Sequence, residues 1–282
     1  MKITERQISE FKRNGYVCIH GFVSADEARA ALEGVYALVA PSYENWIASG
    51  KRNSTIGQRD FPWDHSGLNA LALHPDLIDA AERIIGTREL RLCTGHVWMK
   101  YSGEDYGQGF HIDYPNNTLG PIQSPDDFQH ITFLYYLDDV DEDLAPVLMT
   151  PNGRDDSAAV PVTGRAGSVC IYSIYTRHSA SVFRRAGQRP AMWVTVARKD
   201  RPWDMAVMYS VNSDAAYKGM ARVMAESSAR QIEFLGFPPA GDGLWTPEFL
   251  EGMATRYPGF DPEKMLSCSA VPASSACRAG DR

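Results

Sequence analysis

GSVCIYSIY (Gly167–Tyr175) and RPAMWVTVAR (Arg189–Arg198) are two runs of branched and aromatic residues that lie close together in the chain. Such a composition is typical of β-strands. Similar runs precede them at Leu90–Tyr101, Phe128–Leu137 and Ala145–Thr150. Several strands in series with few helices between them predict an antiparallel sandwich or barrel.

Helices are expected on both sides of this β region. Two pairs of residues near the start of the chain, Thr4 with Gln7 and Ser24 with Glu27, fit capping boxes, which mark helix N-termini. The expected helices cover residues 4–14, 24–40, 76–85, 213–228 and 247–256, with a short strand over 16–22. By contrast, residues 42–67 lack clear periodicity and are expected to form a long irregular segment.

The expected fold is therefore mainly β with flanking helices, in a single domain over residues 1–266. It would consist of a helical N-terminal part (1–88), a β core (89–200) and a helical C-terminal part (201–266). The remaining residues, 267–282, are mostly Ser, Ala, Gly and Pro with little to bury, and are expected to be a disordered tail.

Composition and charge argue against several classes of partner. The net charge is −7 and the Lys and Arg residues are scattered, so no basic stripe exists for nucleic acid. Neither a signal peptide nor a window of about 18 apolar residues is present, which predicts a cytoplasmic protein without a membrane span. The five cysteines form no close pair of the zinc or redox type, and Cys18, Cys93 and Cys170 are expected to be buried thiols. The oligomeric state is left open.

His111-Ile112-Asp113 is the first sign of chemistry. Two metal-binding side chains that are two residues apart point to the same face of an extended backbone. The stretch His74-Pro75-Asp76 has the same spacing, but Asp76 is expected to cap the helix that follows. His178, just after the Gly167–Tyr175 strand, is the best candidate for a third ligand.

Two histidines and one carboxylate on one face of an octahedral metal leave three adjacent positions open, as non-haem Fe(II) oxygenases require. Two positions suit the 2-oxo acid of 2-oxoglutarate and the third suits O2. The distal carboxylate of 2-oxoglutarate needs a fixed cation, and a guanidinium binds it through two hydrogen bonds. Arg189 is preferred, because an antiparallel hairpin would bring its strand beside the one bearing His178. The alternatives, in an expected loop, are Arg177, Arg184 and Arg185.

The set His111-x-Asp113, His178 and Arg189, with the opening FKRNGYVCIHGFVSADE (11–27), resembles the phytanoyl-CoA dioxygenase family of iron and 2-oxoglutarate oxygenases. The resemblance spans roughly residues 5–200. It implies a double-stranded β-helix, a cupin-like jelly-roll, that binds Fe(II), 2-oxoglutarate and O2. Related halogenating enzymes carry a small residue in place of the carboxylate ligand, so Asp113 favours hydroxylation of a small organic substrate. Desaturation, cyclisation and epimerisation stay open.

The resemblance also bears on the residues around the centre. The family often has a Gly-Ser-His stretch before the distal histidine, whereas Leu144–Gly153 contains no histidine, so substrate access on that side is expected to differ. A serine hydroxyl after His178 is expected to assist the co-substrate carboxylate; Ser181 is the candidate, with Ser179 as the alternative. Residues that line the substrate pocket, or serve only in packing and turns, are Trp98, Lys100, Tyr101, Gln108, Tyr114, Asn116, Asn117 and Trp193.

Two other functions fit the same residues. A β-barrel binding or sensor protein would keep the scaffold without turnover, although the complete ligand set argues against it. A cupin-like hydrolase or isomerase would hold zinc or manganese at the triad and use Arg189 to bind substrate. Anaerobic addition of Fe(II) and 2-oxoglutarate is expected to give a weak visible charge-transfer band only for the oxygenase, or for an inactive protein that still binds both.

Overall fold

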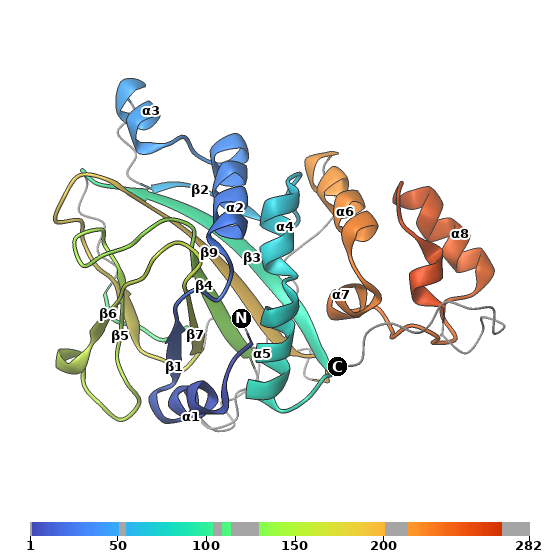
Figure 1. The fold of residues 1–282 in the computed structure, drawn as a ribbon, viewed down its shortest axis with the longest axis horizontal. Helices are drawn as coiled ribbons and strands as arrows, with labels where there is room; N and C mark the ends of the chain where they lie inside the picture. Colours follow the sequence, from blue (N-terminus) through green and yellow to red (C-terminus); the bar gives the residue numbers. More distant parts are fainter. Residues whose placement is uncertain (1, 51–54, 104–108, 114–129, 201–213, 267–282) are drawn as a thin grey trace.

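The computed structural model of the chain describes residues 2–50, 55–103, 109–113, 130–200 and 214–266. Its strands form two antiparallel sheets (Figure 1). In spatial order the large sheet contains β1 (Tyr16–Ile19), β7 (Val169–Ser173), β4 (His130–Tyr136), β9 (Gln188–Arg198), β3 (Leu90–Tyr101) and β2 (Thr55–Asp60). The small sheet contains β6 (Val160–Val162), β5 (Val147–Met149) and β8 (His178–Ala180). The prediction of antiparallel sheets with flanking helices is confirmed.

The two faces of the large sheet bury different sets of side chains. Alternation along each strand sends successive residues to opposite faces, and Val17, Phe133 and Val194 join a core with apolar side chains of the helices. On the other face, Leu134 and Cys170 pack with Met149 of the small sheet. The strands are therefore buried on both sides, as their nearly continuous apolar sequence requires.

Helices cover the first of these faces, with α2, α4 and α5 crossing in front of the large sheet in Figure 1. The helices are α1 (Glu5–Asn14), α2 (Ala25–Leu38), α3 (Tyr43–Ala48), α4 (Ser66–Ala72), α5 (Pro75–Ile85), α6 (Asp214–Glu226), α7 (Ala229–Phe234) and α8 (Pro247–Arg256). Both predicted capping boxes are present, at Thr4 and Ser24. None of the helices in the described ranges is long and apolar enough to cross a membrane.

Two predictions about the N-terminal part are wrong. The segment 42–67 is not irregular: it contains α3, β2 and the start of α4. These elements are short, and α3 depends on a stacking contact between Trp46 and Tyr101 of β3, with ring centroids 4.6 Å apart, that local periodicity does not reveal. The cap of α5 is His74, whose Nδ1 accepts a hydrogen bond from the backbone of Asp76, so Asp76 lies in the first turn.

The expected hairpin between the strands that precede His178 and contain Arg189 is also absent. In the large sheet β4 lies between β7 and β9, so these two strands are not neighbours. His178 itself belongs to the small sheet, where β8 pairs with β5. The chain thus passes from one sheet to the other between His178 and Arg189, and the two residues approach the same interior from opposite sheets.

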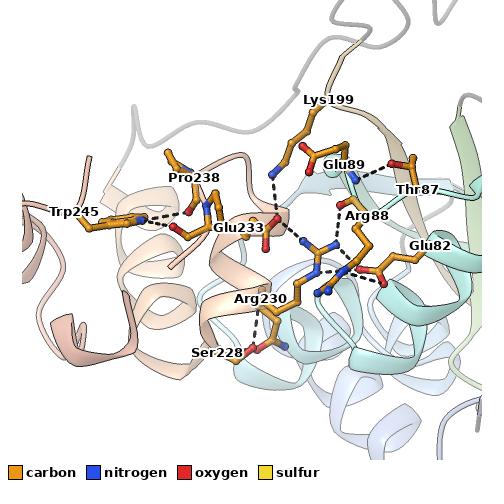
Figure 2. A network of polar contacts seen from close by, with 12 residues as sticks. Glu82, Thr87, Arg88, Glu89, Lys199, Ser228, Arg230, Glu233, Pro238 and Trp245 are labelled. Atoms are coloured by element: carbon orange, nitrogen blue, oxygen red, sulfur yellow. Dashed lines mark hydrogen bonds and ion pairs between the residues drawn. The ribbon is translucent and has the colours of Figure 1, made fainter. Parts of the chain in front are cut away.

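The C-terminal helices α6–α8 lie on the side of the molecule away from β5 and β6 (Figure 1). A polar network fixes α7 to the core (Figure 2). The Arg230 guanidinium contacts Glu82 at the end of α5, the carbonyl of Arg88 and, at 2.7 Å, Glu233. Lys199, just after β9, lies 3.8 Å from Glu233. Two side chains and one backbone carbonyl, from three separate segments, therefore contact α7.

Candidate metal centre

A short segment, residues 109–113, lies along the free edge of β8. The backbone N–H of His111 donates to the carbonyl of His178 at 3.0 Å, and the N–H of His178 donates to the carbonyl of His111 at 2.9 Å. The N–H of Asp113 donates to the carbonyl of Ile174 at 3.1 Å. These bonds fix the backbone positions of the three predicted ligands relative to one another.

The ligand atoms of His111, Asp113 and His178 converge on one point. The Nε2 atom of His111 is 3.9 Å from Oδ1 of Asp113, and the Nε2 atom of His178 is 3.8 Å from the same oxygen. Bonds of about 2.1 Å allow two ligands of one metal ion to be up to roughly 4.2 Å apart. The three side chains therefore form a group that can hold a metal ion, as the sequence predicted.

Hydrogen bonds to the other ring nitrogen orient both imidazoles. Nδ1 of His111 lies 2.9 Å from the carbonyl oxygen of Gly109, and Nδ1 of His178 lies 3.0 Å from that of Thr176. A carbonyl can only accept, so it holds the proton on Nδ1 and leaves Nε2 with a free lone pair toward the metal. The arrangement thus selects the tautomer that binds metal.

The centre is partly sheltered from water. The side chain of His178 is 12% exposed, while those of Asp113 and His111 are 23% and 29% exposed, so one side stays accessible. Burial lowers the pKa of His178, against the opposing effect of the Asp113 carboxylate. A lowered pKa favours the neutral imidazole, which is the form that coordinates a metal.

Arg189 lies in the interior between the two sheets. Its side chain is 5% exposed and one guanidinium nitrogen donates to the carbonyl of Ala145 at 2.7 Å. The Nε atom is buried with no hydrogen-bond partner in the described part of the chain, and no described carboxylate pairs with the guanidinium. A buried cation in this state has unused binding capacity for an anion.

Lys100 on β3 is the direct register partner of Arg189 on β9. It is 3% exposed, and its Nζ donates to the carbonyl of Ser181 at 2.7 Å. Burial, with a smaller contribution from the Arg189 charge, lowers the pKa of Lys100 to about 8. Ser181 follows His178 by three residues, so the carbonyl that accepts from Lys100 lies in the segment that bears a predicted metal ligand.

The other arginines considered from the sequence lie outside this interior. Arg177 forms an ion pair with Asp156 at 2.7 Å, and Arg185 forms one with Asp141 at 2.6 Å. Both pairs are exposed, as is Arg184. The Ser181 hydroxyl donates to the carbonyl of Pro146, beside the residue that holds Arg189.

The residues expected to contact the substrate lie on different faces of the large sheet, because successive residues of a strand point to opposite faces. Trp98 and Trp193 lie on the inner face, with ring centroids 6.4 Å apart, and Trp193 packs against the inner core. Tyr101 does not join them: it is fully buried in the helix-covered core, and its hydroxyl donates to the carbonyl of Pro41. Its position does not fit the expected substrate contact. Four further predictions lie outside the described residues: Gln108, Tyr114, Asn116 and Asn117.

Three inner-face residues go beyond the site roles predicted from the sequence. Lys100 is predicted only to line the substrate pocket, and Tyr172 and His130 have no predicted site role. Tyr172 has its ring 5.2 Å from that of His178. His130 is 1% exposed and neither ring nitrogen has a partner among the described residues. Period-two alternation along β3, β4 and β7 places these three residues on one face, but only the strand pairing reveals which strands meet.

A family model described as phytanoyl-CoA dioxygenase matches residues 11–191, which is more than half of the chain. The chain belongs to the phytanoyl-CoA dioxygenase family. The matched segment contains every residue of the metal centre and Arg189, whereas the C-terminal helices of this phytanoyl-CoA dioxygenase family member lie beyond it. No match was found among curated proteins.

Solved structures share the fold at low sequence identity. The nogalamycin-biosynthesis epimerase SnoN is 20% identical, with a TM-score of 0.52 over 69% of this chain and 82% of that protein. The carbocyclase SnoK of the same biosynthesis is 21% identical, with a TM-score of 0.53 over 70% and 84%. EctD from S. alaskensis, solved with bound Fe, is 16% identical, with a TM-score of 0.55 over 73% and 80%. These three structures share the fold of this chain.

Proposed function

We propose that the protein is an Fe(II)- and 2-oxoglutarate-dependent dioxygenase that hydroxylates a small organic substrate and releases succinate and CO2. One observation carries the proposal: the group of His111, Asp113 and His178 lies in the same interior as Arg189, a buried guanidinium without an anionic partner among the described residues. Membership of the family supports it. We further propose that the two sheets form the double-stranded β-helix that the resemblance implies.

The donor set fits Fe(II). His111, Asp113 and His178 would hold the ion through two imidazoles and one carboxylate, a donor set that would leave coordination positions for a 2-oxo acid and for dioxygen. The carbonyls of Gly109 and Thr176 hold the two rings with Nε2 toward the ion. When bound, iron supplies the activation of dioxygen, and the role of the protein is to position the reactants and limit water.

The buried cations Arg189 and Lys100 suit one carboxylate of a dicarboxylate co-substrate. Arg189 has a free Nε–H, and a guanidinium presents parallel N–H groups that match a carboxylate. Lys100 adds a second positive charge on the adjacent strand, and an anion between them would relieve the repulsion that contributes to the lowered pKa of Lys100. We therefore propose that both residues bind the distal carboxylate of 2-oxoglutarate, with Ser181 keeping the strand in place.

Hydroxylation is the preferred reaction, because the Asp113 carboxylate occupies the ligand position that halogenation needs vacant. Epimerisation and carbocyclisation are the activities named for SnoN and SnoK, both described as alpha-ketoglutarate dependent, so the same scaffold supports other outcomes. Trp98 and Trp193 are proposed to face the substrate.

The first test is spectroscopic. Anaerobic addition of Fe(II) and 2-oxoglutarate is expected to produce a visible charge-transfer band, and His111→Ala is expected to abolish it. Arg189→Met should weaken 2-oxoglutarate binding by roughly 30-fold or more, since losing one partner of a buried charged pair costs at least about 2 kcal/mol. Arg184→Met, at an exposed arginine, is the matched control and should leave the titration unchanged.

The second test measures turnover, as succinate released from 2-oxoglutarate in the presence of a metabolite panel. Release that depends on one class of compound identifies the substrate class, and product analysis by mass spectrometry distinguishes hydroxylation from the other outcomes. A band without succinate release for any compound would favour a metabolite-binding protein on this scaffold. Absence of both the band and iron binding would refute the proposal.

A further inference from the structure

Two cysteines face each other across the edge of the large sheet. Cys18 in β1 is the direct register partner of Cys170 in β7, and β1 is the edge strand. Opposed residues of an antiparallel pair have Cα atoms about 4.5 to 5.5 Å apart, within the range that a disulfide bond spans. Both residues are free thiols in the structure.

The two side chains lie on the same face of the sheet. Cys170 belongs to the inner core and Cys18 packs against that core. Because the two residues are directly opposed in the register, a bond between their sulfurs requires rotation about side-chain torsions and little movement of the backbone.

The two cysteines differ in how far they are exposed to solvent. Cys170 is 1% exposed, whereas Cys18, which was expected to be buried, is only half-buried because it lies on the outermost strand. Burial, together with the neighbouring Cys18, raises the pKa of the Cys170 thiol well above its usual value. A small oxidant in solution can thus reach one thiol of the pair directly, and the other only after that first reaction.

Metal binding does not explain the pair. Structural zinc sites use four Cys or His ligands, and among the described residues the only group of three or more His, Cys, Asp or Glu side chains that can hold an ion is the one at His111. The residues next to the thiols on this face are Tyr16 and Tyr172, which are also register partners. Two sulfurs beside phenol rings form a redox-capable pair without a metal.

We propose that Cys18 and Cys170 form a reversible disulfide when the protein meets a hydroperoxide. The Cys18 thiolate attacks the peroxide, the O–O bond breaks, and Cys18 becomes a sulfenic acid as water or an alcohol leaves. The sulfur of Cys170 then attacks the sulfur of Cys18, the S–O bond breaks, and the hydroxide leaves as water with the proton of Cys170. Two thiols thereby lose two electrons and two protons, and one peroxide is reduced.

The new bond would join the edge strand covalently to β7, the strand that contains Tyr172 and leads toward His178. Because the Tyr172 ring contacts the His178 ring, the linkage lies two residues along β7 from a side chain that touches a predicted metal ligand. A small-molecule thiol can reverse the bond by attacking the half-exposed sulfur of Cys18. This site is independent of the reaction proposed above.

The test uses the full chain with Cys268 and Cys277 replaced by Ser, so that those thiols cannot exchange with the pair. The protein is treated with equimolar hydrogen peroxide, then denatured, alkylated, digested and analysed by mass spectrometry. We expect a cross-linked peptide containing Cys18 and Cys170, lighter by two hydrogen atoms than its two parts, that dithiothreitol removes. Cys93, a buried thiol on β3, is the internal control and should remain alkylated.

Two variants test the order of the steps. Cys18→Ala should slow the oxidation of Cys170 by about tenfold or more, because the buried thiol then loses its accessible partner. Cys170→Ala should leave Cys18 as a sulfenic or sulfinic acid. The proposal is overturned if the unsubstituted pair yields no cross-linked peptide while Cys18 becomes sulfinic, or if Cys170 reacts equally fast without Cys18. The measurement on the unsubstituted pair decides the question even where a variant fails to fold.

Discussion

His130 is a buried polar residue whose ring nitrogens form no hydrogen bond with the described residues. Its imidazole is 1% exposed and both ring nitrogens lack partners among the described residues, although buried polar groups are normally hydrogen-bonded. Leaving such a group unsatisfied costs about 1 to 3 kcal/mol. Burial lowers the pKa of His130 from 6.5 to about 4, so the ring is neutral at pH 7.

The lowered pKa of His130 leads us to predict how the free energy of unfolding depends on pH. Between about pH 6.5 and pH 4 the unfolded chain binds a proton at this histidine and the folded protein does not, so the free energy of unfolding falls as the pH falls. The slope from this group approaches about 1.4 kcal/mol per pH unit. We expect His130→Leu to raise the free energy of unfolding at pH 7 by roughly 1 kcal/mol. The variant should also lose the part of the pH dependence that His130 contributes.

Urea denaturation of both proteins at pH 7, 5.5 and 4.5 checks the prediction. The advantage of the His130→Leu variant should grow as the pH falls, and contributions from the metal-binding histidines cancel in the difference. Parallel pH profiles for the two proteins would show that the imidazole takes up its proton in the folded state, and would contradict the assignment.

Residue-level reasoning from the sequence found the metal ligands because their spacing has a geometric meaning. His111 and Asp113 are two residues apart on an extended segment, and His178 follows a recognisable strand. The same reasoning misplaced Tyr101: it has the opposite parity to Trp98 and Lys100 on β3, and so faces the helices. The role of Lys100 beside Arg189 depends on the register between β3 and β9, which no local pattern specifies.

At the scale of elements, the length of a helix or strand determined whether the sequence could predict it. The long strands and the capped helices were found with nearly correct bounds, because many residues contribute to each periodic pattern. The three-residue strands β6 and β8 and the short helix α7 were missed, since their conformation comes from tertiary contacts. The order of strands in the large sheet could not be predicted from the sequence either. For this reason β9 was wrongly expected to pair with the strand before His178.

Ala145, just before β5, gives a test of strain in a connecting element. Its φ of 52° lies in the left-handed region, which costs an L-residue roughly 1 to 2 kcal/mol. Ala145→Gly removes this strain but adds freedom to the unfolded chain, worth about 0.5 to 1 kcal/mol. The net expectation is a rise of about 0.5 to 1 kcal/mol in the free energy of unfolding, measured by chemical denaturation.

A control for that substitution is available in the next connecting segment. Ala159 has a φ of −64°, an ordinary value, so Ala159→Gly should lower the free energy of unfolding by roughly 0.5 to 1 kcal/mol. Opposite signs for the two variants would establish that the backbone at Ala145 is held under strain, with its carbonyl directed at Arg189. A loss of stability in both variants would contradict this.

At the scale of the whole molecule, the network in Figure 2 joins the C-terminal helices to a core that the family match already covers. Arg230 contacts Glu82 and Glu233, whose side chains are 21% and 15% exposed. Arg230→Met would leave both carboxylates partly buried without this partner, which is unfavourable. We expect a loss on the order of 1 to 2 kcal/mol and faster amide hydrogen exchange in α7, with exchange in β4 and β7 unchanged.

Arg29 on α2 offers the matched control. Its pair with Asp26 has side chains that are 68% and 83% exposed, and such surface pairs contribute little. Arg29→Met should therefore change stability by less than about 0.5 kcal/mol, although it also removes one positive charge. If the two variants behave alike, the network at Arg230 acts as an ordinary surface pair and apolar packing alone holds α7 in place. If exchange rises in α7 only for Arg230→Met, the charged contacts determine how firmly the C-terminal helices are attached.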